Sequence, residues 1–189
     1  AQKWIRLAHV YTSMVALLLV LFFGATGLTL NHPEWTFGLE ANASTEAGTL
    51  PSTAVRSDGT VELLAFSEYL RSEHDVRGSV TDFVAGDQGS ISYRGPGYAA
   101  DVRFDTATRH FDLDVEQQGL IAVMNDLHKG RDTNTSWGWL IDVSAGFLVA
   151  IAASGLGLQL FLRRRRTSSL VVAGVGAVLA VVIGITSLT

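Results

Sequence analysis

The chain contains three long apolar runs, and one long polar segment separates the first run from the other two. The runs extend over Val10–Leu30, Trp137–Leu162 and Leu170–Leu188. Each is about long enough to cross the hydrocarbon core of a bilayer, because a helix rises about 1.5 Å per residue. We therefore predict three transmembrane helices in contact with lipid, with residues 33–136 forming the part of the chain outside the membrane.

The first helix is expected to end at Asn31-His32-Pro33. Asparagine is common at helix C-termini, and a residue that precedes proline is disfavoured in the α region. A secretory signal peptide is the rival interpretation of this run. The run is longer than a typical signal h-region, however, and no clear small-residue cleavage site follows it, which favours a retained helix. The following segment, 33–60, is rich in small polar residues and predicts an irregular tether.

From Val61 onward the pattern becomes that of a folded domain. Apolar residues at helical spacing predict a helix from Val61 to about Glu73. Four runs of strand-forming residues follow, each bounded by a turn signal, and they predict a short antiparallel meander. These runs are Ser79–Ala85, Ser90–Arg94, Ala99–Phe104 and His110–Val115.

An amphipathic helix is expected over Gln117–Lys129, lying along the membrane surface and ending at Gly130. The predicted fold class is therefore an α+β membrane protein, with three transmembrane helices and a small αβ domain outside the membrane. The expected organisation is a first helix at 1–32, the tether at 33–60, the folded domain with its surface helix at 61–136, a second helix at 137–162, an arginine loop at 163–167 and a third helix at 168–189.

Charge orients these elements. Residues 33–136 carry 17 acidic and 8 basic side chains, whereas the remaining basic residues are Lys3, Arg6 and Arg163–Arg166. Since basic residues flank membrane helices on the cytoplasmic side, we expect the N-terminus inside and the acidic domain outside. This distribution argues against nucleic-acid binding. The absence of cysteine excludes a disulfide, an iron–sulfur cluster and a covalently attached c-type haem.

Three stretches resemble the PepSY-associated transmembrane proteins of bacterial inner membranes. They are HVYTSMVALLLVLFFGATGLTLNHPEW near the start, NDLHKGRDTNTSWGWLID in the middle, and the αβ module between them. The resemblance implies a PepSY-like domain on the periplasmic side. It also implies kinship with haem-b proteins that reduce ferric iron or ferric siderophores. The larger reductases of that group carry more helices and more histidines than this chain does.

Three of the five histidines, His9, His32 and His128, fall at expected membrane edges, where ionisable groups usually mark sites. A haem b held by two imidazoles would require a pair of them. His32 and His128 share the outer side and are the first choice, because His9 lies about 34 Å from His32 along the first helix. His9 would instead pair with His9 of a second copy or with a partner's ligand. The alternative is that His9 only reaches the cytoplasmic surface and that His128 is an ordinary loop histidine.

Lys129 and Arg131 place positive charge beside His128. They could bind haem propionates or an anionic ferric chelate, or they could form plain surface ion pairs with Asp126 and Asp132.

These observations favour an inner-membrane haem-b electron carrier, acting as a ferric reductase that passes single electrons from a quinol or another donor to periplasmic iron. The small domain and the thin three-helix bundle also favour a homodimer. The competing interpretation is a non-catalytic accessory or assembly subunit that acts through its PepSY-like domain. A third is a periplasmic metal chaperone.

Overall fold

The computed structural model describes residues 2–38, 41–161 and 166–188, with side chains at 11–38, 41–153, 155–156 and 167–188. It divides into two units, residues 1–141 and 142–189, and each is described by itself. The side chain of His9 lies outside the described residues, as does most of the arginine loop expected at 163–167.

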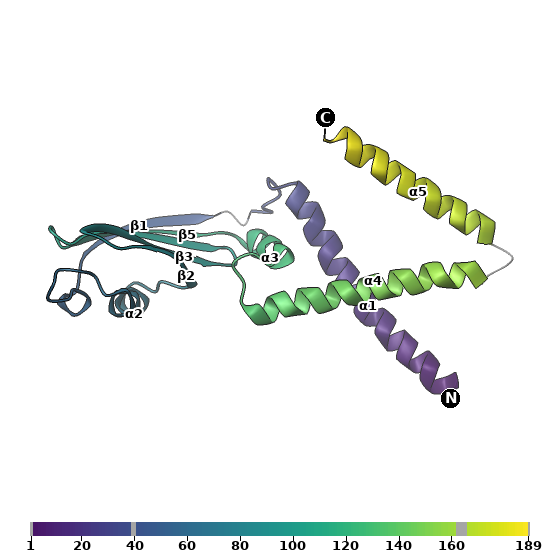
Figure 1. Ribbon diagram of the computed structural model, residues 1–189, viewed down its shortest axis with the longest axis horizontal. Helices are drawn as coiled ribbons and strands as arrows, with labels where there is room; N and C mark the ends of the chain where they lie inside the picture. The colour runs from purple at the N-terminus through teal and green to yellow at the C-terminus, as the bar shows by residue number, and fades with distance from the viewer. Residues whose placement is uncertain (1, 39–40, 162–165, 189) are drawn as a thin grey trace. The chain divides into compact units, whose positions relative to one another are not determined.

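Five antiparallel strands form one sheet, in the order β1-β5-β4-β3-β2. They are β1 (Asn42–Thr49), β2 (Ser79–Val84), β3 (Gln88–Gly95), β4 (Tyr98–Asp105) and β5 (His110–Gln117). The four strands predicted from the sequence are β2 to β5, joined by hairpins as expected. Figure 1 shows the strands running side by side, with β1 as the outermost strand of one edge. We refer to residues 42–117 as the sheet domain.

The strand β1 lies inside the segment expected to be an irregular tether, so that expectation is wrong for residues 42–49. Every residue of β1 pairs with β5, from Asn42 opposite Gln117 to Thr49 opposite His110. The side chains of β1 are small and polar, and nearly all of them are exposed. Because this strand is held by backbone pairing rather than by a buried apolar face, it has no hydrophobic alternation to reveal it.

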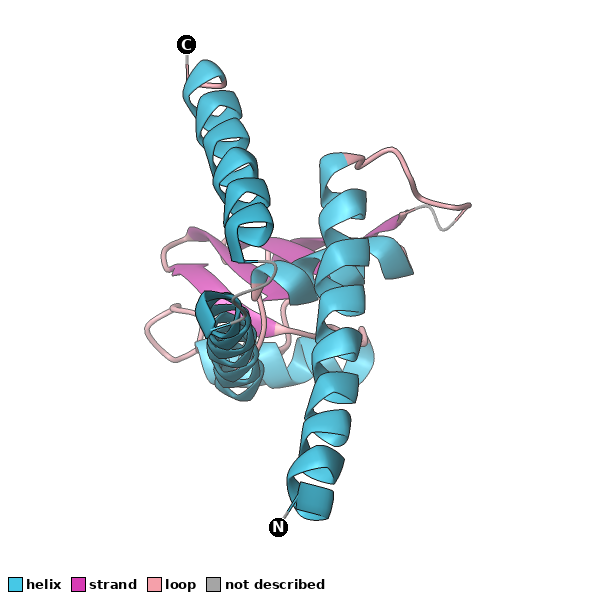
Figure 2. Cartoon of the chain, turned by 90° about the vertical axis from the view of Figure 1, so that its right-hand side faces the viewer, coloured by secondary structure: helices cyan, strands magenta, loops and turns pink. Residues whose placement is uncertain are grey.

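Helix α2 (Leu63–Glu73) covers one face of the sheet and closes its core. Phe66 and Leu70 on this helix are fully buried, and they meet the alternating inward-facing residues of three strands. These strand residues are Ile91, Tyr93, Ala100, Val102, Phe104, Phe111 and Leu113. A short 3-10 helix, η1 (Ser52–Ala54), leads into α2 and adds Ala54 to the core. Figure 2 shows the strands gathered in a single layer.

Within the described part of the chain, three helices are long and apolar enough to span a membrane: α1 (Gln2–Asn31), α4 (Thr135–Phe161) and α5 (Arg166–Thr186). The apolar stretches within them are 11–31, 135–153 and 167–186. They coincide with the three predicted runs, so the chain is an α+β membrane protein as expected. The third helix already begins at Arg166, inside the expected arginine loop.

Helix α3 (Leu120–Lys129) follows the sheet and ends where the sequence predicts. Gly130 caps it with a φ of 66°, the left-handed conformation that glycine adopts without steric penalty. The helix starts three residues later than expected, because Gln117 is still paired in β5 and its partners in β1 and β4 are Asn42 and Tyr98.

Candidate functional site at the junction of α1 and α3

Helix α3 is fastened to the sheet at the turn between β3 and β4. Gly97 in this turn has a φ of 64°, and a Cβ there would overlap Val123 of α3. The Gly97 N–H donates a hydrogen bond to Oδ2 of Asp126 at 3.0 Å. Glycine is therefore required at this position both for the turn and for the close approach of the helix.

Asp126 is only 5% exposed, and its carboxylate has partners on both oxygens. Oδ2 accepts from the backbone of Gly97, and Oδ1 accepts from Nη2 of Arg131 at 2.7 Å. Arg131 also lies 3.7 Å from Asp132 through Nε. Its guanidinium therefore serves a structural pair, which is one of the two roles expected from the sequence.

Helix α3 is fastened to α1 by two hydrogen bonds. The hydroxyl of Thr26 lies 2.5 Å from Nδ1 of His128, and the hydroxyl of Thr29 lies 2.6 Å from Oδ1 of Asn125. Thr26 and Thr29 are three residues apart on α1, and Asn125 and His128 are three residues apart on α3. The two residues on each helix therefore lie on one helical face. We call these four residues the α1–α3 ladder.

The hydroxyl of Thr26 lies where it can select which nitrogen of His128 carries the proton. It is 2.6 Å from the carbonyl of Phe22, which can only accept, and 2.5 Å from Nδ1 of His128, whose role depends on the tautomer. When the hydroxyl proton goes to the carbonyl, the oxygen of Thr26 accepts from Nδ1–H of His128. In that tautomer the lone pair of the neutral imidazole is on Nε2, which makes no hydrogen bond to the described residues. A ring whose N–H is anchored in this way is the arrangement typical of a metal-ligating histidine.

Aromatic side chains surround the imidazole of His128 and its helix. The ring of Phe23 meets that of His128 edge to face at 5.1 Å, and Gly27 of α1 lies beside the imidazole. Trp137, at the start of α4, donates its indole N–H to the carbonyl of Leu127 at 2.9 Å, and its ring packs against Phe22. The imidazole is thus half-buried between fixed neighbours.

His32 has different partners. Its Nδ1 lies 3.2 Å from Glu34, its ring stacks on Trp35 at 4.2 Å, and its side chain is 40% exposed. The direct contact between Thr29 and Asn125 lies between the positions of His32 and His128 on the paired helices.

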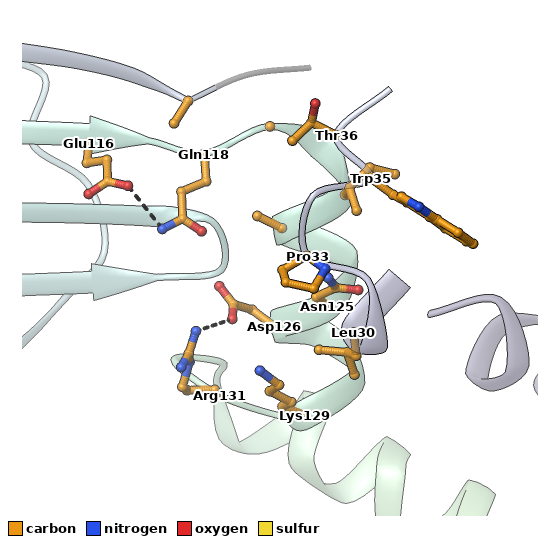
Figure 3. A pocket seen from close by; sticks show the side chains of 14 residues that line it. Leu30, Pro33, Trp35, Thr36, Glu116, Gln118, Asn125, Asp126, Lys129 and Arg131 are labelled. Carbon is orange, nitrogen blue, oxygen red and sulfur yellow. Dashed lines mark hydrogen bonds and ion pairs between the residues drawn. The ribbon is translucent and has the colours of Figure 1, made fainter. Parts of the chain in front are cut away.

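A cleft of about 320 Å³ lies beside the ladder, between the end of α1 and α3. Figure 3 shows Lys129 and Arg131 at one end of it, Leu30 and Pro33 along its wall, and the pair Glu116–Gln118 at the other end. This volume is at the small end of the range for ligand pockets, and no histidine lines the cleft. Lys129 is exposed, and no described residue forms an ion pair with it.

The two remaining histidines belong to the sheet domain. His74 pairs with Glu46 at 2.9 Å, and His110 lies 3.4 Å from Asp112. Over the described residues, no group of three or more histidine, aspartate or glutamate side chains is placed to hold a metal ion.

The sequence interpretation singled out His128, Lys129 and Arg131 but missed the partners that position them. Thr26 and Thr29 are two polar residues near the end of an apolar run, three positions apart, and that spacing matches Asn125 and His128 on α3. This matched spacing was the available signal. The fixation of Asp126 by the backbone of Gly97 has no comparable signal, because it depends on how the hairpin meets the helix.

Comparison with known proteins gives one match that covers nearly the whole chain. A family model described as "Putative PepSY_TM-like" matches residues 1–188. No curated protein and no solved structure matches the chain.

Proposed function

Because this chain belongs to the PepSY_TM-like family of membrane proteins, we propose that it is a haem-b electron carrier of a bacterial inner membrane that delivers single electrons to ferric iron. The observation that carries the proposal is the setting of His128. Its Nδ1 lies 2.5 Å from the hydroxyl of Thr26, and its Nε2 makes no hydrogen bond to the described residues. With Nδ1 held by Thr26, Nε2 would be the donor to haem iron.

Among the described residues we take His128 as the one haem ligand that each copy would supply. His32 of the same copy is separated from it by the Thr29–Asn125 contact on the paired helices. His9 of the same copy is too far from His128 to be the second ligand. It lies 18 residues before Gly27, the α1 residue beside His128, which is about 27 Å along the helix axis. We therefore assign the second axial position to His128 of a second copy, related by a two-fold axis that brings identical residues together.

Bound haem would supply one-electron redox chemistry, and the chain's own residues would prepare the site for it. Thr26 holds the ring orientation of His128 and would select the tautomer with the proton on Nδ1, and Phe23 shields one side of the imidazole. Lys129 supplies a cation for a propionate or for an anionic ferric chelate. Electrons would come from a quinol or a partner protein.

The proposed orientation places the N-terminus in the cytoplasm and the sheet domain in the periplasm. It rests on Lys3, Arg6 and Arg163–Arg166, set against an acidic sheet domain.

An optical spectrum tests the haem proposal. Full-length protein purified in detergent from haem-replete cells should show Soret and α bands in the reduced-minus-oxidised difference. Replacing His128 by alanine should remove them, whereas His74→Ala and His110→Ala serve as matched controls that keep them. His32→Ala should also keep them, because the second ligand is assigned to the other copy. Unchanged bands in His128→Ala would exclude the proposed ligand.

A second function, that of an accessory or assembly subunit, is favoured by one feature of the sheet domain. One edge of its sheet is open along a full strand. If purified protein contains no haem, this function becomes the better account.

A further inference from the structure

The two edges of the sheet are built differently. At one edge, the pairing of β2 with β3 is interrupted by a register shift between Val80 and Asp82. An irregularity of this kind protects an edge strand from pairing with another chain. At the other edge, β1 pairs without a shift over all eight residues. It contains no proline, lysine or arginine, and its one charge, Glu46, is paired with His74 on the α2 face.

The direction of the free backbone groups follows from one hydrogen bond. Leu50 N–H donates to the carbonyl of Arg109 at 2.9 Å, which continues the register of β1 and β5 by one residue. Backbone groups alternate in direction along a strand, so even-numbered residues of β1 bond to β5. The N–H and C=O groups that face the open edge are therefore those of Ala43, Thr45, Ala47 and Thr49.

The side chains at the open edge are small, and carboxylates lie directly behind them. On the face away from α2, Ala43 is opposite Glu116 and Ala47 is opposite Asp112. Thr45, between them, donates to Asp114 at 2.8 Å. A lysine or arginine on a strand added beside β1 could extend over either alanine to the carboxylate behind it.

We propose that β1 receives an extended, basic segment of another protein as a sixth strand. Backbone hydrogen bonds to the four outward-facing residues would give the affinity, as in other cases of β-strand addition. Alternating lysine or arginine side chains would give the preference for a basic segment, through ion pairs with Asp112 and Glu116. A second copy of this chain fits less well, because its own β1 would bring alanine and threonine to this edge instead of cations.

The inference does not depend on haem, so its test is separate from that of the proposed function. The probe is a fluorescent eight-residue peptide of alternating lysine and threonine, titrated against the full chain in detergent and followed by anisotropy. Two matched peptides serve as controls. One has glutamate in place of lysine, and the other is N-methylated at alternate residues, which removes strand hydrogen bonds while keeping the charge.

The variants address the backbone and the charges separately. Ala47→Pro removes one outward N–H and should weaken binding by about tenfold, whereas Ala47→Ser keeps the N–H and should bind normally. The double change Asp112→Asn with Glu116→Gln should lower the affinity for the lysine peptide. Hydrogen exchange of β5 amides shows whether each variant keeps its sheet.

Saturable binding of the lysine peptide, lost on N-methylation and weakened by Ala47→Pro, is the expected result. Equal binding of the N-methylated peptide would reduce the interaction to general charge attraction and overturn the proposal. No binding of the lysine peptide, or dimerisation of the chain through β1 that Ala47→Pro abolishes, would also overturn it.

Discussion

Two helices of the same unit are held in opposite ways. Helix α2 is held on the sheet by fully buried apolar side chains, with Phe66 and Leu70 at the centre. Helix α3 is held by directed polar contacts, with Asp126 on the turn at Gly97 and the α1–α3 ladder on the membrane helix. Apolar burial stabilises without fixing a direction, whereas the hydrogen bonds of α3 fix the register of the helix and hold Nδ1 of His128 against Thr26.

The largest predicted effect is the loss of stability when an apolar side chain of α2 is removed from the core. Phe66→Ala should lower the free energy of unfolding of the sheet domain by about 3–5 kcal/mol, because it leaves a cavity in a closed core. The matched control on the same helix is Leu64→Ala, whose side chain is 68% exposed and should change stability by no more than about 0.5 kcal/mol. Urea unfolding of the full chain, followed by hydrogen exchange of β3 and β4, measures both. A loss below about 1 kcal/mol for Phe66→Ala would contradict the central place of α2.

The next effect is at the polar anchor of α3. Asp126→Ala should lower the stability of the junction by about 2–3 kcal/mol, since it leaves the Gly97 N–H and the Arg131 guanidinium without their carboxylate. Asp132→Ala is the control, because Asp132 is more exposed and lies farther from Arg131. Hydrogen exchange of α3 amides is the measurement. Equal exchange in the two variants would show that the buried carboxylate is not the anchor.

A smaller effect on stability is expected in the ladder, with a larger effect on the histidine. Thr26→Val keeps the shape of the side chain and should lower stability by only about 1 kcal/mol. It should also release the Nδ1–H of His128, so that nitrogen NMR of labelled histidine reports a mixture of tautomers. Thr29→Val should give a similar loss of stability and leave the tautomer of His128 unchanged. A single tautomer in both variants would argue against the positioning role of Thr26.

The smallest effect is the pH dependence of one surface carboxylate. Burial alone would raise the pKa of Asp101, but hydrogen bonds from Ser92 and Arg94 outweigh it and hold the pKa below 3.8. Because the folded pKa is depressed, its contribution is present above pH 3.8 and is lost as the pH falls through the lower folded value. The difference in urea midpoint between wild type and Asp101→Asn should therefore shrink from pH 6 to pH 3. A difference that grows on acidification would reverse this sign.

The contrast between the helices also explains what the sequence could predict. The spans, α2, and strands β2 to β5 follow from apolar periodicity, which reports burial directly. The strand β1 escaped prediction because Asn42–Thr49 bury almost nothing, and its position depends on pairing with a distant strand. His128 was found from its place near a membrane edge, but its orientation by Thr26 depends on a contact 102 residues away in the chain.

The ligand assignment that the polar junction supports is tested most directly by counting haem per chain. The molar mass of the purified wild-type protein in detergent is measured by light scattering, and its haem is quantified. The oxidised sample is then examined by electron paramagnetic resonance. The account predicts a dimer with one low-spin, bis-imidazole haem for every two chains, and complete loss of that signal in His128→Ala. One haem per chain in a monomer, with a signal that survives His128→Ala, would contradict it.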